Sequence, residues 1–333
     1  MKYAINLFWL VLFGLGACET VVDVDVPREA PRLVVNSFIG VDAPVAVVVS
    51  QSKFVLSNEP LQVVSGAEVV LLEDEQVVAT LAETHPNDNT INAATGFYAT
   101  DFVPSAGRSY TLRVSKSGFE SVEATALIAP PISIANLRYD TITITYEQFD
   151  DNTGNFTTVQ EPSLNQVWLG IDDPSDEENF YQVLVQRYTI SYNFEQDDDG
   201  NFVITDTFRI LSPIPLVSDD PLVDDNDDFF GDDDGFSVNG IFMFSDEIFN
   251  GRLYTFNFSV DQTFGFGQEQ ESEYFITLRT LSEAQYRYML SADLQQETEG
   301  NPFAEPVPVF NNVQGGYGIF VGYSADVDTV LVE

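Results

Sequence analysis

Period-two alternation of apolar and polar residues recurs along this chain and restricts its fold to β-sheets. Isoleucines and a tyrosine alternate with threonines over residues 141–146, and four apolar residues share one face over residues 253–260. Successive side chains of a strand point to opposite faces, so each such run offers one face to a core and one to water. No segment repeats at a fixed period, which argues against a propeller or solenoid. We therefore predict a mainly β protein.

A pair of prolines divides these runs into two groups. Pro130 and Pro131 interrupt strand pairing and stiffen the connection, and 333 residues fit two domains at about 150 residues each. We predict domains over residues 33–129 and 132–333, the second mainly antiparallel. The predicted strands are Leu33–Ile39, Val45–Gln51, Ala67–Leu72, Val77–Leu81, Tyr110–Ser115, Tyr181–Phe194, Phe202–Leu211, Leu253–Val260 and Tyr274–Leu281.

The end of the first group has a closely spaced series of turns and strands. Gly96-Phe97-Tyr98 is followed by a turn at 104–107, the alternating strand from Tyr110, and Gly118-Phe119-Glu120. This series resembles the immunoglobulin-like or transthyretin-like modules of exported proteins, including the regulatory module of carboxypeptidases. The resemblance implies a β-sandwich of about 100 residues in the N-terminal domain.

One helix is predicted near the end of the second group. Ser282 and Gln285 have the spacing of a capping box, and apolar residues follow at 286, 289, 290 and 294. We predict a helix over residues 283–296 that packs this stripe on the second domain, although a partner-binding helix would carry the same stripe. The predicted fold is two β-sandwich-like domains, with one short helix in the second.

The first residues are typical of a lipoprotein export signal. Lys2 precedes an apolar run that ends in small residues just before Cys18, the only cysteine. The run is shorter than the about 20 apolar residues of a spanning helix. We predict that residues 1–17 are cleaved, that Cys18 is lipidated and that residues 18–32 form a tether; an ordinary signal peptide with a coincidental cysteine is the alternative. Two or more acyl chains hold a protein firmly on a membrane.

The charge balance limits the possible partners. The chain has 53 acidic and 13 basic residues, a net charge of −40, so it lacks the basic stripe that nucleic acid requires. With Cys18 lipidated, no thiol remains for a disulfide, a cysteine nucleophile or a zinc ligand. The single histidine, His85, lies in a polar turn, which disfavours a catalytic triad. We predict no catalytic activity. Paired carboxylates for glycoside cleavage stay open in principle, since carboxylates are plentiful.

Several motifs together resemble one known family. They include Cys18-Glu19, the segment 31–39 that begins Pro-Arg-Leu-Val-Val-Asn, the Gly96-Phe97-Tyr98 turn, and the C-terminal segments 301–306 and 315–323. These are similar to the lipoprotein family of the Bacteroidota known as domain of unknown function 4249, and the resemblance covers nearly the whole mature chain. It implies a cell-envelope accessory role beside a TonB-dependent outer-membrane receptor and carries over no catalytic residues.

The resemblance also bears on location. Glu19, Asp23 and Asp25 close behind the lipidated cysteine resemble the signal that directs such lipoproteins to the outer face of the outer membrane. We expect a lipid-anchored outer-membrane protein at the cell surface, with the periplasmic face as the alternative. The function expected is a binding or accessory component. The alternatives are a calcium-stabilised adhesin-like module or a carboxylate-dependent glycosidase.

Two acidic loops are the candidate sites outside the anchor. The first has the oxygen ligands and the glycine of a calcium loop at EF-hand spacing. Its ligands would be Glu195, Asp197, Asp199, Asn201 (through its carbonyl) and Asp206. The flanking residues are typical of strands, so a plain acidic hairpin is the alternative. The second loop, residues 219–235, is expected to be disordered or surrounded by cations, with Phe229 and Phe230 either pinning it or contacting a partner.

Overall fold

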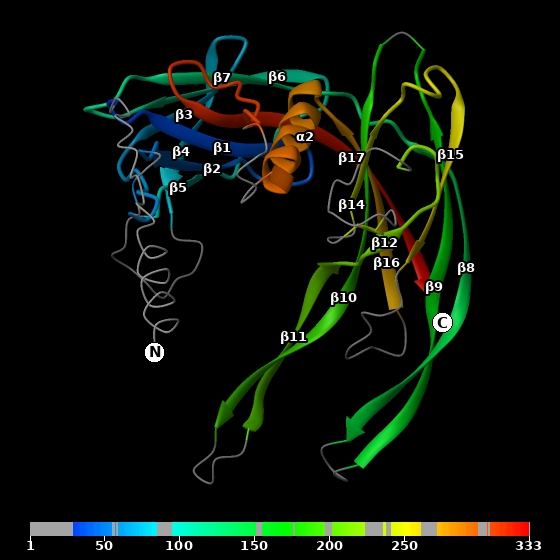
Figure 1. The fold of residues 1–333 in the computed structure, drawn as a ribbon. Coiled ribbons are helices and arrows are strands. Elements are labelled where there is room, and N and C mark those ends of the chain that lie inside the picture. The colour runs from blue at the N-terminus through cyan, green and yellow to red at the C-terminus, as the bar shows by residue number, and fades with distance from the viewer. Residues whose placement is uncertain are drawn as a thin grey trace, which may run out of the picture.

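The structure of this chain is a computed structural model in which the described residues form β-strands and one α-helix (Figure 1). It describes residues 29–54, 57, 59–84, 95–150, 155–175, 177–196, 202–223, 236–237, 241–260, 272–298, 305 and 307–332. The mainly β prediction is confirmed. The strands form one large mixed sheet of 12 strands and a second sheet of five.

The N-terminal part of the chain surrounds one hydrophobic core. Its strands are β1 (Leu33–Gly40), β2 (Ala46–Gln51), β3 (Glu68–Glu73), β4 (Gln76–Glu83), β5 (Phe97–Ala99), β6 (Arg108–Ser115) and β7 (Val122–Ile128). They pair in the order β1-β2-β5-β4-β3-β6-β7. Alternate residues such as Val35, Leu71 and Leu112 are fully buried and pack together. The period-two pattern therefore sorts core from surface as expected.

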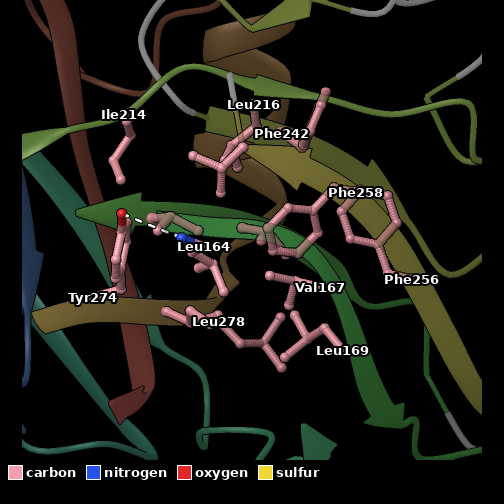
Figure 2. Packing of buried hydrophobic residues seen from close by; sticks show 14 of the residues in the cluster. Leu164, Val167, Leu169, Ile214, Leu216, Phe242, Phe256, Phe258, Tyr274 and Leu278 are labelled. Carbon is pink, nitrogen blue, oxygen red and sulfur yellow. Dashed lines mark hydrogen bonds between the residues drawn. The ribbon is translucent and has the colours of Figure 1, made fainter. Parts of the chain in front are cut away.

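The rest of the chain builds a second core between two sheets. Its strands are β8 (Ile134–Asp150), β9 (Asn155–Asp172), β10 (Phe180–Gln196), β11 (Phe202–Pro213), β12 (Leu216–Val217), β13 (Phe236–Ser237), β14 (Ile241–Ser245), β15 (Leu253–Val260), β16 (Ser272–Leu281) and β17 (Tyr317–Val332). The five-stranded sheet has the order β13-β12-β15-β9-β8 and faces β10, β16 and β17 of the large sheet. Figure 2 shows Val167, Phe256 and Leu278 meeting between them, and the Tyr274 hydroxyl accepting a bond from the Leu164 N–H at 3.4 Å.

The long strand β17 belongs to both halves. Its first residues pair in parallel with β1, from Val34 with Tyr317 to Gly40 with Tyr323, and its remainder pairs antiparallel with β16. Accordingly, Phe320 lies in the first core and Val330 in the second. Gly318 has a φ of 112°, and any Cβ there would collide with the Val35 carbonyl oxygen, so only glycine allows this close pairing. One continuous sheet thus passes through both cores.

The helix α2 (Glu283–Thr298) begins where predicted and ends two residues later. The Ser282 hydroxyl caps it by accepting the Gln285 N–H at 3.3 Å. Half of the predicted capping box is wrong, because the Ser282 N–H donates to the Gly322 carbonyl and not to Gln285. Tyr286 and Met289 pack on the second half as predicted, but Leu294 of the predicted stripe is 42% exposed, so that part of the prediction is wrong. Tyr288 also contacts Phe38 of β1, with ring centroids 5.9 Å apart. The helix therefore contacts both halves.

Candidate functional site

Most of the residues that the sequence singles out lie outside the described part of the structure. These are Cys18, His85, Asp197, Asp199, Asn201, Phe229 and Phe230. Glu195 and Asp206 lie on β10 and β11, opposite Val203 and Asn193, so the flanks of the acidic loop are paired strands. The predicted strands are therefore confirmed, and the calcium ligands stay a prediction. Within the described residues, no three His, Cys, Asp or Glu side chains are grouped to hold a metal ion.

The described start of the second acidic segment is not solvated as expected. Asp220 is buried, and its carboxylate accepts the Tyr254 hydroxyl at 2.6 Å and the N–H groups of Leu222 and Asn257 at 3.1 and 3.2 Å. Burial, followed by this bond to Asp220, raises the pKa of the Tyr254 hydroxyl. A carboxylate with three donors is stable in a buried position because its charge is compensated by hydrogen bonds. Asp220 is thus an anchor of the fold.

Two further buried carboxylates lie near the junction of the halves. Asp173 accepts the Tyr181 hydroxyl and the Gly251 N–H, the latter at 2.7 Å. Asp246 is fully buried, and one of its oxygens accepts the Asn179 N–H at 2.9 Å while the other lacks a partner within the described residues. Burial raises the pKa of Asp246; the bonds from Asn179 oppose this shift, and the Asp173 charge adds to it. These contacts hold loops together, and among the described residues they form no group of three side chains that could hold a metal ion.

Two long hairpins extend away from the cores. Among the described residues, β10 pairs only with β11 beyond Arg187, and β8 and β9 continue as a two-stranded ribbon beyond the end of β15. Figure 1 shows both hairpins projecting toward the same side of the molecule. A two-stranded ribbon alone is marginally stable in water. Projecting ribbons of this kind are suited to contacts with another molecule.

The base of the β10–β11 hairpin continues into an exposed apolar surface, which we call the outer patch. It consists of Tyr188, Leu211, Phe275, Val327 and Leu331, on the face of β11-β10-β16-β17 that points away from the second core. Tyr188 is paired with Leu211 and contacts the Phe275 ring edge-on at 5.6 Å. Phe275 is paired with Thr329, which stands between Val327 and Leu331 on this face.

The outer patch is exposed to solvent over most of its members. The exposed fractions are 53% for Val327, 48% for Leu331 and 39% for Leu211. Single exposed apolar residues are common, whereas several grouped on one face of a sheet indicate an interaction surface. Arg209 lies over the Tyr188 ring at 4.4 Å, and Glu273 is paired with Leu331, so charged residues border the apolar centre. An apolar centre with a polar border is the usual composition of a protein interface.

The other end of the same sheet face is covered by α2. Phe180 stacks on Tyr286 with ring centroids 4.6 Å apart, and Met289 and Met243 complete the cluster. Arg279 lies 4.4 Å from the Tyr323 ring centroid and donates to the Gln182 side chain at 2.9 Å. These contacts pack one end of the sheet face against α2, whereas the side chains of the outer patch at the other end are exposed to solvent.

The residues of the outer patch escape a search for motifs because they carry only ordinary apolar chemistry. A signal was nevertheless present: Tyr274-Phe275-Ile276 and Val330-Leu331-Val332 are apolar on both faces of their strands. A half-buried strand should be polar on its outer face. Apolar residues on both faces indicate that the second face also has a partner.

A comparison with known protein families matches residues 19–329 to the family described as Domain of unknown function (DUF4249). The chain belongs to the DUF4249 family. No curated protein matches it. The DUF4249 match covers both hairpins and β17 up to residue 329, so every residue of the outer patch except Leu331 falls within the family domain. Within the described part of this DUF4249 chain, no helix is long and apolar enough to cross a membrane.

Proposed function

We propose that this protein is a non-catalytic lipoprotein of the outer membrane that binds a partner protein through the outer patch. The observation that carries the proposal is the group of exposed apolar side chains on one face of a sheet whose opposite face is already packed against a core. The lipid on Cys18 and the tether 18–32 would hold the protein at the membrane, at the cell surface or on the periplasmic face. In this proposal the two halves are β-sandwich domains, the first immunoglobulin-like or transthyretin-like.

The chemistry of the surface limits what the partner can be. A second copy is disfavoured, because each chain carries a net charge of −40 and two copies repel each other. The carboxylate of Glu273 at the border, within a strongly acidic chain, favours a partner whose apolar contact surface is rimmed by basic residues. The family resemblance implies a TonB-dependent receptor in the same membrane, and we propose its extramembrane loops as the partner.

Site-specific photocrosslinking in intact cell envelopes tests this proposal. A photoreactive phenylalanine at Val327 or Leu331 is expected to crosslink to an outer-membrane receptor, identified by mass spectrometry. The matched control is the same residue at Leu61, which is 62% exposed on the N-terminal half. The proposal is wrong if the patch positions recover no such receptor, or if Leu61 recovers it equally well.

A further inference from the structure

A pocket with both charged and aromatic walls lies in the N-terminal half, where residues 29–32 lie beside the end of β2. Its volume is about 860 Å³, and Tyr317 at the start of β17 forms part of its wall. The Arg32 N–H donates to the Ser52 hydroxyl at 3.0 Å, and the Ser52 N–H donates to the Arg32 carbonyl at 2.8 Å. This volume is within the range of small-molecule sites.

The charges in this pocket are balanced, unlike those of the chain as a whole. Arg32 and Glu29 form an ion pair at 3.5 Å. Lys53 and Glu59 also line the pocket, and neither forms an ion pair within the described residues. In a chain with four times more acidic than basic residues, one free ammonium and one free carboxylate share a single concavity. Both remain available to a ligand.

A fixed pair of side-chain amides lies beside these charges. The side-chain Nε2 of Gln51 donates to the side-chain Oε1 of Gln62 at 2.6 Å. An amide side chain has one acceptor oxygen and two donor hydrogens, so this bond leaves the Gln51 oxygen and the Gln62 NH₂ group able to bind. One acceptor and one donor side by side match the C=O and N–H groups of a peptide. The Tyr317 ring, 43% exposed, provides apolar surface beside them.

We propose that this pocket binds a short peptide with free termini. Lys53 binds the terminal carboxylate, Glu59 binds the terminal ammonium, and the Gln51–Gln62 pair binds a peptide group between them. A purely anionic ligand would leave Glu59 repelling it, and a purely cationic ligand would do the same with Lys53. Charges separated by more than about 8 Å are screened at physiological salt, so these local groups decide the ligand despite the charge of −40. This inference does not depend on the outer patch.

Calorimetric titration of the whole protein with trialanine tests the proposal. Trialanine is expected to bind saturably, and N-acetyl-trialanine amide, which lacks both terminal charges, is expected to bind at least about tenfold more weakly. The peptides blocked at one end identify each contact. Amidation of the carboxylate should weaken binding to the wild type and have little effect on Lys53→Gln, whereas acetylation of the amine should have little effect on Glu59→Gln.

The control variants are Arg252→Gln and Glu247→Gln, which change the net charge equally at exposed positions in the C-terminal half. They should bind trialanine as the wild type does. The proposal is overturned if trialanine does not bind at millimolar concentration, or if the doubly blocked peptide binds as tightly. It is also overturned if Lys53→Gln and Glu59→Gln behave like their controls.

Discussion

The two ends of one sheet face differ in a way that explains which residues hold the fold and which are free to act. On the outer face of β10, β16 and β17, α2 covers Phe180 and Leu281 at one end, whereas Val327 and Leu331 at the other end are about half exposed. Both ends are apolar, so apolar character alone does not distinguish residues that stabilise the fold from residues that are free to bind a partner. The difference is the presence of a covering helix.

The largest expected effect is at the covered end. Phe180→Ala removes a ring that is 7% exposed and stacked on Tyr286, and should lower the free energy of unfolding by about 3 to 5 kcal/mol. Leu331→Ala on the bare end should lower it by less than about 0.5 kcal/mol. Urea denaturation measures both. Equal losses would show that the outer patch is also covered within the protein.

The next effect is an increase in stability if calcium binds the loop between β10 and β11. If Glu195, Asp197, Asp199, Asn201 and Asp206 bind the ion, a calcium concentration of 100 times the dissociation constant stabilises the fold by about 2.7 kcal/mol. Thermal denaturation with millimolar calcium, and then with a chelator, measures this effect. The variant Asp197→Asn, Asp199→Asn serves as control and should lose it. No shift in the wild type would leave an acidic hairpin and remove the calcium-stabilised adhesin alternative.

A pH dependence should come from Asp246, near the covered end. Its pKa is raised in the folded state by burial, so the folded protein holds this proton more tightly than the unfolded chain does. Stability from this group is fully present below the unfolded pKa and is lost as pH rises through the raised folded pKa. Asp246→Asn should lack that decline. Urea denaturation at a series of pH values from 4 to 8 compares the two, and parallel curves would contradict the assignment.

A smaller effect is expected where the two halves meet. The Tyr323 hydroxyl donates to the Asp42 carboxylate at 3.0 Å, which links β17 to the loop after β1. Tyr323→Phe should lower the free energy of unfolding by about 1 kcal/mol, the usual contribution of one hydrogen bond. Tyr317→Phe on the exposed start of β17 is the control. A loss as large for the control as for Tyr323→Phe would remove this role.

The smallest effect on stability should come from the outer patch itself. Val327→Ser is expected to change the free energy of unfolding by less than about 0.5 kcal/mol, because the side chain is already 53% exposed. The same change should reduce crosslinking from Leu331 to the receptor. A variant that leaves crosslinking intact would place the interface elsewhere.

Several local elements could be predicted from the sequence because their signals are local, whereas β7, β9 and β17 were not predicted as strands. The strand β15 has the predicted bounds Leu253–Val260, β1 begins at Leu33 as predicted, and α2 begins at Glu283. Alternation and a serine cap depend on neighbours within a few residues, and one sequence contains them. The same reasoning placed Tyr286 in the packed stripe of α2.

What the sequence did not reveal depends on contacts between distant segments. The glycines of 315–323 were noticed as motif residues, but their pairing with β1 follows only from the folded sheet. The outer patch likewise combines residues from four strands. Asp220 was expected in a solvated loop because its segment is acidic, and its burial depends on Tyr254, which is 34 residues away.

The position of β17 has a consequence for how the chain must mature. β1 and β17 lie side by side, yet every other described strand lies between them in the sequence. Until β17 is made, the N-terminal core lacks Phe320 and one edge of β1 has no neighbour. A nascent chain therefore has an open strand edge at β1 from the synthesis of β1 until that of β17, and an unpaired strand edge of this kind is prone to aggregation.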